Sequence, residues 1–263
     1  NLKENTCSSV ENTFIVNQSC KIIYSPYEKI PVIIVGNFPM LGKLTALRFL
    51  EWVQNSPNGV ISLPTGKTPE YFIKWVKHFL ENWDDSKVQK ELEANGLNPS
   101  IKPQMNKLHF VQIDEFYPIN PAQTNSFNYY VRNFYIKDFG LDPDKCLLID
   151  PLQIGLQINE RLEDYWPNAT VDLSLRYRNP KNNLEIKQKE LLSRIDRWSM
   201  EYENKIRKLG GIGFFLGGIG PDGHIGFNVK GSDHNCTTRL CPVNYETQAA
   251  AAADLGGIEV AKN

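Results

Sequence analysis

A glycine-rich segment in the second half of the chain brings a carboxylate and an imidazole within two residues of each other. The segment reads Gly217-Gly218-Ile219-Gly220-Pro221-Asp222-Gly223-His224. A carboxylate can orient a neighbouring imidazole, and an imidazole can donate or accept a proton near neutral pH. Asp222 and His224 are therefore the expected acid–base pair. His78 falls within a predicted helix and His109 within a predicted strand, so both are expected to be structural.

The same segment contains the spacing Gly218, Gly220 and Gly223, which also occurs in dinucleotide-binding loops. A dinucleotide-binding loop opens directly into a helix and is followed by an acidic residue about 20 positions later. Residues 225–231 lack the apolar periodicity of a helix. The sequence therefore does not predict a dinucleotide site.

A second candidate loop, Pro64 to Pro69, lies between a predicted strand and a predicted helix. The free N–H groups and the dipole of a helix N-terminus favour a phosphate. The inner residues offer two hydroxyl donors, a glycine that allows close backbone approach and a positive charge: Thr65, Gly66, Lys67 and Thr68. On these residues alone, an ordinary strand-to-helix turn stays open. A P-loop is rejected, because Ile61 stands where that motif needs a glycine.

Two adjacent acids, Asp114 and Glu115, follow another predicted strand. Successive side chains of a strand point to opposite faces, so only one of the two can enter a site. A carboxylate at the carboxyl end of a buried strand is a candidate proton acceptor, and a solvated loop acid is the alternative.

The elements that must position these residues alternate between short apolar runs and amphipathic stretches. Strands are predicted at 32–35, 60–63, 108–113, 146–149 and 212–216, and helices at 41–54, from Pro69 through Leu80, and at 126–134, 188–209 and 245–255. Thr68 is the predicted N-cap of the second helix. The pattern predicts an α/β fold, a Rossmann-like open parallel sheet flanked by helices on both faces. We expect a single domain over residues 1–263, with an insertion at 156–183.

Composition excludes several classes of protein. The net charge of -1 favours neither nucleic acid nor an anionic membrane surface. No apolar run is long enough to span a bilayer, and residues 1–10 lack the apolar core of a signal peptide. The five cysteines, at positions 7, 20, 146, 236 and 241, include no Cys-x-x-Cys pair. We therefore expect reduced thiols, a cytoplasmic location and no metal site.

The order of the motifs is more specific than any one of them. Leu63 to Pro69, Ile113-Asp114-Glu115-Phe116, Asn125-Ser126-Phe127 and Gly218 to Asn228 together resemble the glucosamine-6-phosphate deaminase/isomerase family, which is related to the 6-phosphogluconolactonases. Phe227-Asn228 after Asp222-Gly223-His224 favours the deaminase branch.

The resemblance implies a set of roles. The loop with Thr65, Gly66, Lys67 and Thr68 would bind the sugar phosphate, and Gly220 and Asn228 would be further substrate contacts. Asp114 would move a proton between C2 and C1 of the open-chain sugar. His224 would assist ring opening, with Asp222 orienting it. The reaction would be an aldose–ketose isomerisation that releases ammonia and uses no cofactor.

Three departures from the family pattern keep alternatives open. Val229-Lys230 stands where the family usually carries Glu-Pro, and a phosphate-binding arginine is expected within the run Ala249 to Ala253. The chain also ends at Asn263, where the family usually continues. Arg239 is a candidate contact for an effector or a phosphate. A 6-phosphogluconolactonase-type hydrolase and a catalytically impaired sugar-phosphate-binding domain remain alternatives, and a homo-oligomer is left open.

Overall fold

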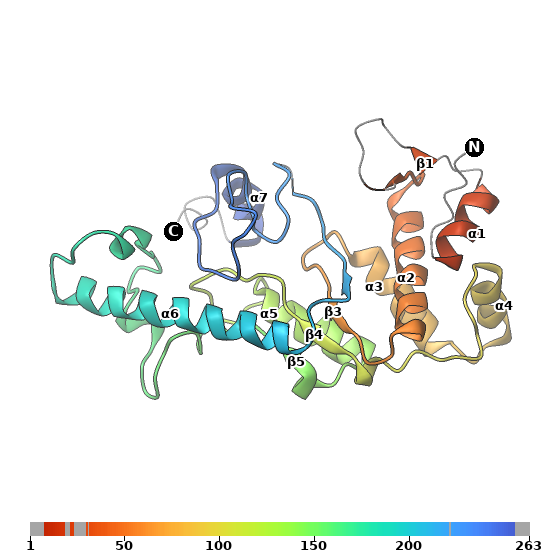
Figure 1. Ribbon diagram of the computed structural model, residues 1–263, viewed down its shortest axis with the longest axis horizontal. Helices are drawn as coiled ribbons and strands as arrows, with labels where there is room; N and C mark the ends of the chain where they lie inside the picture. Colours follow the sequence, from red (N-terminus) through yellow and green to blue (C-terminus); the bar gives the residue numbers. More distant parts are fainter. Residues whose placement is uncertain (1–7, 19–21, 24–29, 31, 221, 256–263) are drawn as a thin grey trace. The chain divides into compact units, whose positions relative to one another are not determined.

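The computed structural model describes residues 8–18, 22–23, 30, 32–220 and 222–255 (Figure 1). The chain forms two compact units. The first unit comprises Asn1–Gly59, Thr65–His109 and Phe134–Lys145, and the second comprises Val60–Pro64, Phe110–Asn133 and Cys146–Asn263. The predicted catalytic residues Asp114, Asp222 and His224 all belong to the second unit.

The first unit is built mainly from helices. Its elements are α1 (Ser9–Gln18), β1 (Ile22–Ile23), β2 (Val32–Ile33), α2 (Phe38–Asn55), α3 (Glu70–Glu81), α4 (Ser86–Ala94), η1 (Met105–Lys107) and η3 (Pro143–Lys145). Helices α2 and α3 pack so closely at Gly42 that a methyl group there would lie 2.4 Å from Cβ of Tyr71. The rings of Phe49 and Phe72 meet edge to face at 5.6 Å.

The second unit contains a four-stranded sheet in the order β5-β4-β3-β6. The strands are β3 (Val60–Ser62), β4 (His109–Val111), β5 (Cys146–Leu147) and β6 (Phe214–Phe215). Strand β3 pairs in parallel with β6, and β4 pairs in parallel with β5. The Ser62 hydroxyl donates to the Val111 carbonyl at 2.6 Å and links β3 to β4. The predicted α/β class, with an open parallel sheet flanked by helices, is confirmed.

One predicted strand has a different partner from the rest. The run 32–35 is present as β2, but β2 pairs antiparallel with β1 in a separate two-stranded sheet. Val32 and Ile34 are 38% and 55% exposed, whereas Ile61 in β3 is fully buried. A short apolar run indicates a strand but does not specify its partner, and this run is not a strand of the parallel sheet.

The helices of the second unit are α5 (Phe127–Tyr130), α6 (Asn183–Lys208) and α7 (Tyr245–Leu255), with a π-helical stretch η2 (Val131–Lys137) directly after α5. Asn182 caps α6, and Gly210 and Gly211, at φ 86° and 88°, end it. The Tyr202 hydroxyl lies 2.9 Å from the carbonyl oxygens of Gln112 and Leu147 and fixes α6 beside β4 and β5.

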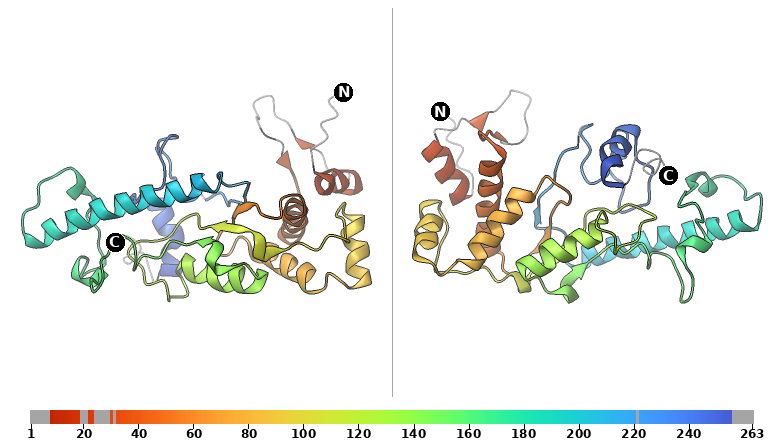
Figure 2. Two further views of the ribbon diagram at one scale, coloured as in Figure 1. Left: turned by 60° about the horizontal axis from the view of Figure 1, so that its bottom comes forward. Right: turned by 180° about the vertical axis from the view of Figure 1, so that it is seen from behind.

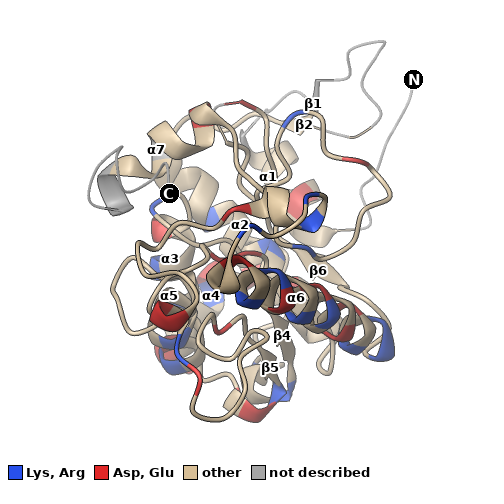
Figure 3. Cartoon of the chain, turned by 90° about the vertical axis from the view of Figure 1, so that its left-hand side faces the viewer, with Lys and Arg blue, Asp and Glu red and all other residues tan. Residues whose placement is uncertain are grey.

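Segment 156–183 contains two short 3-10 helices, η4 (Leu162–Asp164) and η5 (Leu173–Arg176), and lies beside α6 (Figure 2). It buries a set of side chains in the core shared with α6: Leu162, Tyr165, Trp166 and Leu175. Ion pairs join it to α6, namely Arg194–Glu160 at 2.7 Å, Arg176–Asp196 at 2.6 Å and Arg178–Glu185 at 2.7 Å. On the outside of α6, Lys and Arg are interspersed with Asp and Glu (Figure 3).

The start of α3 corrects one expectation. Pro69, not Thr68, occupies the N-cap position, and no side chain caps the helix there. The turn is closed instead by the Glu70 amide, which donates to the Lys67 carbonyl at 3.3 Å. In the described part of the chain, no helix is both long and apolar enough to cross a membrane.

Candidate active site

Asp114 follows β4 at its carboxyl end and is half-buried. Burial raises the pKa of its carboxyl group to about 7, and the neighbouring charge of Glu115 adds to the effect. Within the described part of the chain, no group donates a hydrogen bond to this carboxylate. A carboxyl group with a pKa near neutrality can both accept and return a proton during a reaction.

Glu115 caps the start of helix α5, a role that Asp114 does not share. Its carboxylate accepts hydrogen bonds from the amides of Phe127 and Asn128, at 3.0 and 2.7 Å, and from the Ser126 hydroxyl at 2.8 Å. These contacts satisfy free N–H groups at the start of α5. Burial raises the pKa of Glu115, and these hydrogen bonds act in the opposite direction. The two adjacent acids therefore have different partners.

The backbone of Asp114 is held by the buried side chain of Gln112. The Gln112 amide nitrogen donates to the Asp114 carbonyl at 2.9 Å, and its oxygen accepts from the Ile149 amide at 3.0 Å. The Asn128 side chain donates to the Ile149 carbonyl at 2.9 Å. Gln112 and Asn128 are both 1% exposed. Asp114 thus stands on a rigid backbone at the end of the sheet.

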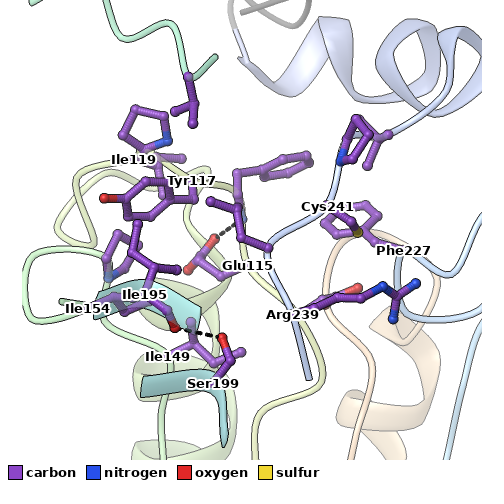
Figure 4. Close-up of a pocket in the computed structure, with 18 of the residues that line it drawn as sticks. Glu115, Tyr117, Ile119, Ile149, Ile154, Ile195, Ser199, Phe227, Arg239 and Cys241 are labelled. Atoms are coloured by element: carbon purple, nitrogen blue, oxygen red, sulfur yellow. Dashed lines mark hydrogen bonds between the residues drawn. The ribbon is translucent and has the colours of Figure 1, made fainter. Parts of the chain in front are cut away.

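Asp114 lines a cavity of about 1050 Å³ within the second unit. In Figure 4, Tyr117, Ile149, Ile154 and Ile195 form one side of the cavity, and Phe227, Arg239 and Cys241 lie on the other side, with Glu115 between the two groups. Asn228 also lines the cavity. The cavity therefore combines an apolar side with polar groups, as binding sites for small molecules usually do.

The loop that carries Asp222 and His224 is compact. Asp222 Oδ1 and His224 Nδ1 are 2.5 Å apart. The Gly220 amide donates to the His224 carbonyl at 2.9 Å, and a methyl group at Gly220 would lie 2.1 Å from the imidazole ring. Gly220 is therefore required for packing against His224, whether or not it contacts a substrate. Asp222 and His224 do not line the cavity among the described residues, but they lie beside it, because Phe227 lines it and its ring is 6.1 Å from that of His224.

Residues after His224 connect this loop to the strand end with Asp114. Gly226 has a positive φ of 55°, and a methyl group there would lie 2.7 Å from Cγ2 of Ile113. The Phe227 ring packs against Phe116 at 4.9 Å and Phe127 at 5.8 Å. These contacts bring the His224 loop close to the strand end that carries Asp114.

Two functional candidates were missed by the sequence analysis. The Asn244 side chain donates to Asp222 Oδ2 at 2.6 Å, and the Thr247 hydroxyl lies 3.1 Å from His224 Nδ1. The Asn244 amide, followed by His224, lowers the pKa of Asp222. An asparagine before a helical run is an N-cap signal, and Asn244 Oδ1 does accept from the Thr247 amide at 3.1 Å. That signal predicts a helix start but not the contact with a loop more than 20 residues earlier.

Arg239 lines the cavity and contacts neutral acceptors. Its guanidinium donates to Asn228 Oδ1 at 3.0 Å, to the Ser232 hydroxyl at 3.2 Å and to the Thr237 carbonyl at 3.4 Å. The contact with Asn228 joins two residues that were predicted separately as site residues.

The remaining predicted residues lie in the first unit. Thr65 and Gly66 are half-buried, whereas Lys67 and Thr68 are exposed at the turn before α3. Gly66 has a φ of 83°, and a methyl group there would meet no atom within 4 Å, so backbone conformation explains the glycine. Among the residues that the structure describes, no three His, Cys, Asp or Glu side chains are grouped as metal ligands would be.

Comparisons with known proteins show which proteins the chain is similar to. No protein-family model matches it. Glucosamine-6-phosphate deaminases of Clostridium botulinum (strain Loch Maree / Type A3) and Halothermothrix orenii are 26% and 23% identical to it over 216 residues, or 82% of this chain. The chain spans 65% and 66% of the lengths of these two relatives.

A solved structure shares the fold. It is described as a monomeric glucosamine-6-phosphate deaminase, a missing link of the NagB superfamily, and it matches 86% of this chain and 70% of its own with a TM-score of 0.58 at 18% identity. In sequence the chain is therefore similar to the glucosamine-6-phosphate deaminases, the family that its motifs resemble, and it shares its fold with one of them.

Proposed function

We propose that the protein converts glucosamine 6-phosphate and water into fructose 6-phosphate and ammonia. One observation carries the proposal: Asp114, with a pKa of about 7, lines a cavity on a backbone held by Gln112. A proton transfer between adjacent carbons needs a base that can take a proton and return it near neutral pH, which this carboxyl group can do. The names and fold of the relatives support the same reaction.

In the proposed mechanism, His224 first assists ring opening of the cyclic sugar by moving a proton between the ring oxygen and the anomeric hydroxyl. Its Nδ1 faces Asp222, so its Nε2 is the nitrogen available for this transfer. Asp114 then removes the proton from C2 of the open-chain aldose and returns it to C1. The C2 amine gives up a proton as O1 takes one, so that C2 becomes an imine and C1 an alcohol. Water then adds to the imine, and ammonia leaves as the C2 ketone forms.

The turn with Thr65, Gly66, Lys67 and Thr68 stays a predicted phosphate-binding element by itself, because its two hydroxyls, ammonium and backbone amides can donate to phosphate oxygens. Arg239, Asn228 and Gly220 are proposed as further contacts of the sugar phosphate or, for Arg239, of an effector. The reaction consists of proton transfers and hydrolysis, so it needs no metal or redox cofactor. We propose a cytoplasmic location, where the free cysteines of the described chain, Cys146, Cys236 and Cys241, stay reduced.

The test is to incubate the protein with glucosamine 6-phosphate and to measure fructose 6-phosphate and ammonia together. Equal amounts of both products support the proposal. Hydrolysis of 6-phosphogluconolactone without action on the amino sugar would replace it by the hydrolase alternative. Binding of glucosamine 6-phosphate by calorimetry, without product, would replace it by the impaired binding domain.

A further inference from the structure

Four residues at the His224 loop and the start of α7 form a closed ring of contacts, which is completed by the backbone amide of Thr247. Asp222 Oδ1 meets His224 Nδ1 at 2.5 Å, and His224 Nδ1 meets Thr247 Oγ1 at 3.1 Å. The Thr247 amide donates to Asn244 Oδ1 at 3.1 Å, and Asn244 Nδ2 donates to Asp222 Oδ2 at 2.6 Å. Thr247 is 2% exposed, so its contact with the imidazole is shielded from water.

The ring determines which imidazole nitrogen carries the proton. An ionised carboxylate can only accept a hydrogen bond, so Nδ1 must donate to Asp222. A threonine hydroxyl can either donate or accept and thus follows the tautomer that Asp222 imposes. The Asn244 amide is the first cause of the lowered pKa of Asp222, and it donates to the ionised carboxylate on which this tautomer depends.

We propose that Asn244 and Thr247 are positioning residues of the reaction. Asn244 supports the carboxylate that keeps His224 in the Nδ1–H tautomer, and Thr247 holds the orientation of the ring, with Nε2 free to act on the sugar. This inference rests on the proposed function of His224. Neither residue needs to touch the substrate, because both act through Asp222 and His224. The ring also explains how the imidazole of His224 is held in a loop that has Val229, and therefore no carboxylate, directly after Asn228.

The ring makes the first turn of α7 part of the catalytic machinery. Asn244 acts at two places, as the N-cap of α7 through Oδ1 and as a donor to Asp222 through Nδ2. Helix formation and imidazole orientation are therefore coupled. Replacing Asn244 by aspartate separates the two tasks, because aspartate keeps the capping oxygen but places a negative charge against Asp222.

The decisive readout is the ¹⁵N NMR spectrum of the His224 imidazole, recorded against pH for the wild type, Thr247→Val, Thr247→Ser and Asn244→Asp. The neutral imidazole of the wild type should show a protonated Nδ1 and a free Nε2. Asn244→Asp should populate the other tautomer, while Thr247→Ser should match the wild type. Matched controls are Asn235→Ala and Thr170→Val, both at exposed positions outside the ring.

Turnover gives the second readout. Asn244→Asp should lower kcat across the pH–rate profile, because Asp222 loses its hydrogen-bond donor and gains a like charge beside it. Thr247→Val should lower kcat about tenfold to a hundredfold, a part of what a positioned acid–base group contributes, with little change in KM. Thr247→Ser should restore it.

The outcomes distinguish the two proposals. Unchanged imidazole spectra and unchanged pH profiles in the folded variants Asn244→Asp and Thr247→Val would overturn the positioning roles. An inactive wild type would overturn the proposed function alone, because the NMR readout needs no turnover. Should Thr247→Val fail to fold, the comparison of Asn244→Asp with Asn235→Ala decides the question in the same way.

Discussion

Replacing Asp114 by asparagine should make the protein more stable at alkaline pH. The carboxyl group has an ordinary pKa of 3.8 in the unfolded chain and a pKa of about 7 in the folded protein. Between these values the unfolded state has lost its proton while the folded state still holds it, so this group lowers stability as the pH rises. Asparagine imitates the protonated form and carries no such penalty.

The size of the effect follows from the two pKa values. At about 1.36 kcal/mol per pKa unit, the rise from 3.8 to about 7 corresponds to about 4 kcal/mol. This loss is absent below pH 4, develops between pH 4 and 7 and is complete above pH 7. For a chain of this size, about 4 kcal/mol raises the melting temperature by about 10 °C.

The assay is thermal and urea unfolding of the wild type and Asp114→Asn at several pH values from 4 to 8. All other titrating groups are shared, so the difference between the two proteins isolates Asp114. The free energy of unfolding of the variant should exceed that of the wild type by a margin that grows with pH. A difference that stays constant over this range would refute a buried carboxyl group with a raised pKa. Asp144→Asn, at an exposed position, is the matched control.

Three further predictions follow from single contacts. Gly220→Ala should lower turnover about tenfold or more, because its methyl group would overlap the His224 ring. Gly36→Ala, whose methyl group would meet no atom within 4 Å, should leave turnover unchanged. Steady-state kinetics of the two variants make the comparison. Glu115→Gln should destabilise the protein by about 1–3 kcal/mol in urea unfolding at pH 7, because an amide cannot accept all the N–H donors at the start of α5. Unaltered stability of Glu115→Gln would contradict its capping role. Arg239→Gln should raise KM for the sugar phosphate about tenfold at constant kcat, and an unchanged KM would exclude Arg239 as a phosphate contact.

The sequence allowed most of the sheet and helices to be predicted, because these elements depend on local signals. Helix α6 has a regular apolar stripe and ends at two glycines, and both features are visible in the sequence. The partner of β2 was not predictable, since a run of four apolar residues fits an exposed antiparallel pair as well as a buried parallel sheet. The cap of α3 was assigned to Thr68, one residue away from its observed position at Pro69.

The candidate site, like the fold, could be predicted only in part. Asp114, Asp222 and His224 were predicted as candidates because their residue types, next to strand ends and glycines, suit proton transfer. The contacts that give them different tasks were not predictable. The capping of α5 by Glu115, the hold of Gln112 on Asp114 and the ring with Asn244 and Thr247 all join residues that only the folded chain brings together.

The proposed role of Asp114 as the proton-transfer group can be measured by kcat/KM of the wild type and of Asp114→Asn on glucosamine 6-phosphate at pH 7. The wild type should turn the substrate over, and the variant should lose about 10²–10⁴-fold while being folded and no less stable. Turnover by Asp114→Asn within a few-fold of the wild type would contradict it, as would a folded wild type that forms neither fructose 6-phosphate nor ammonia.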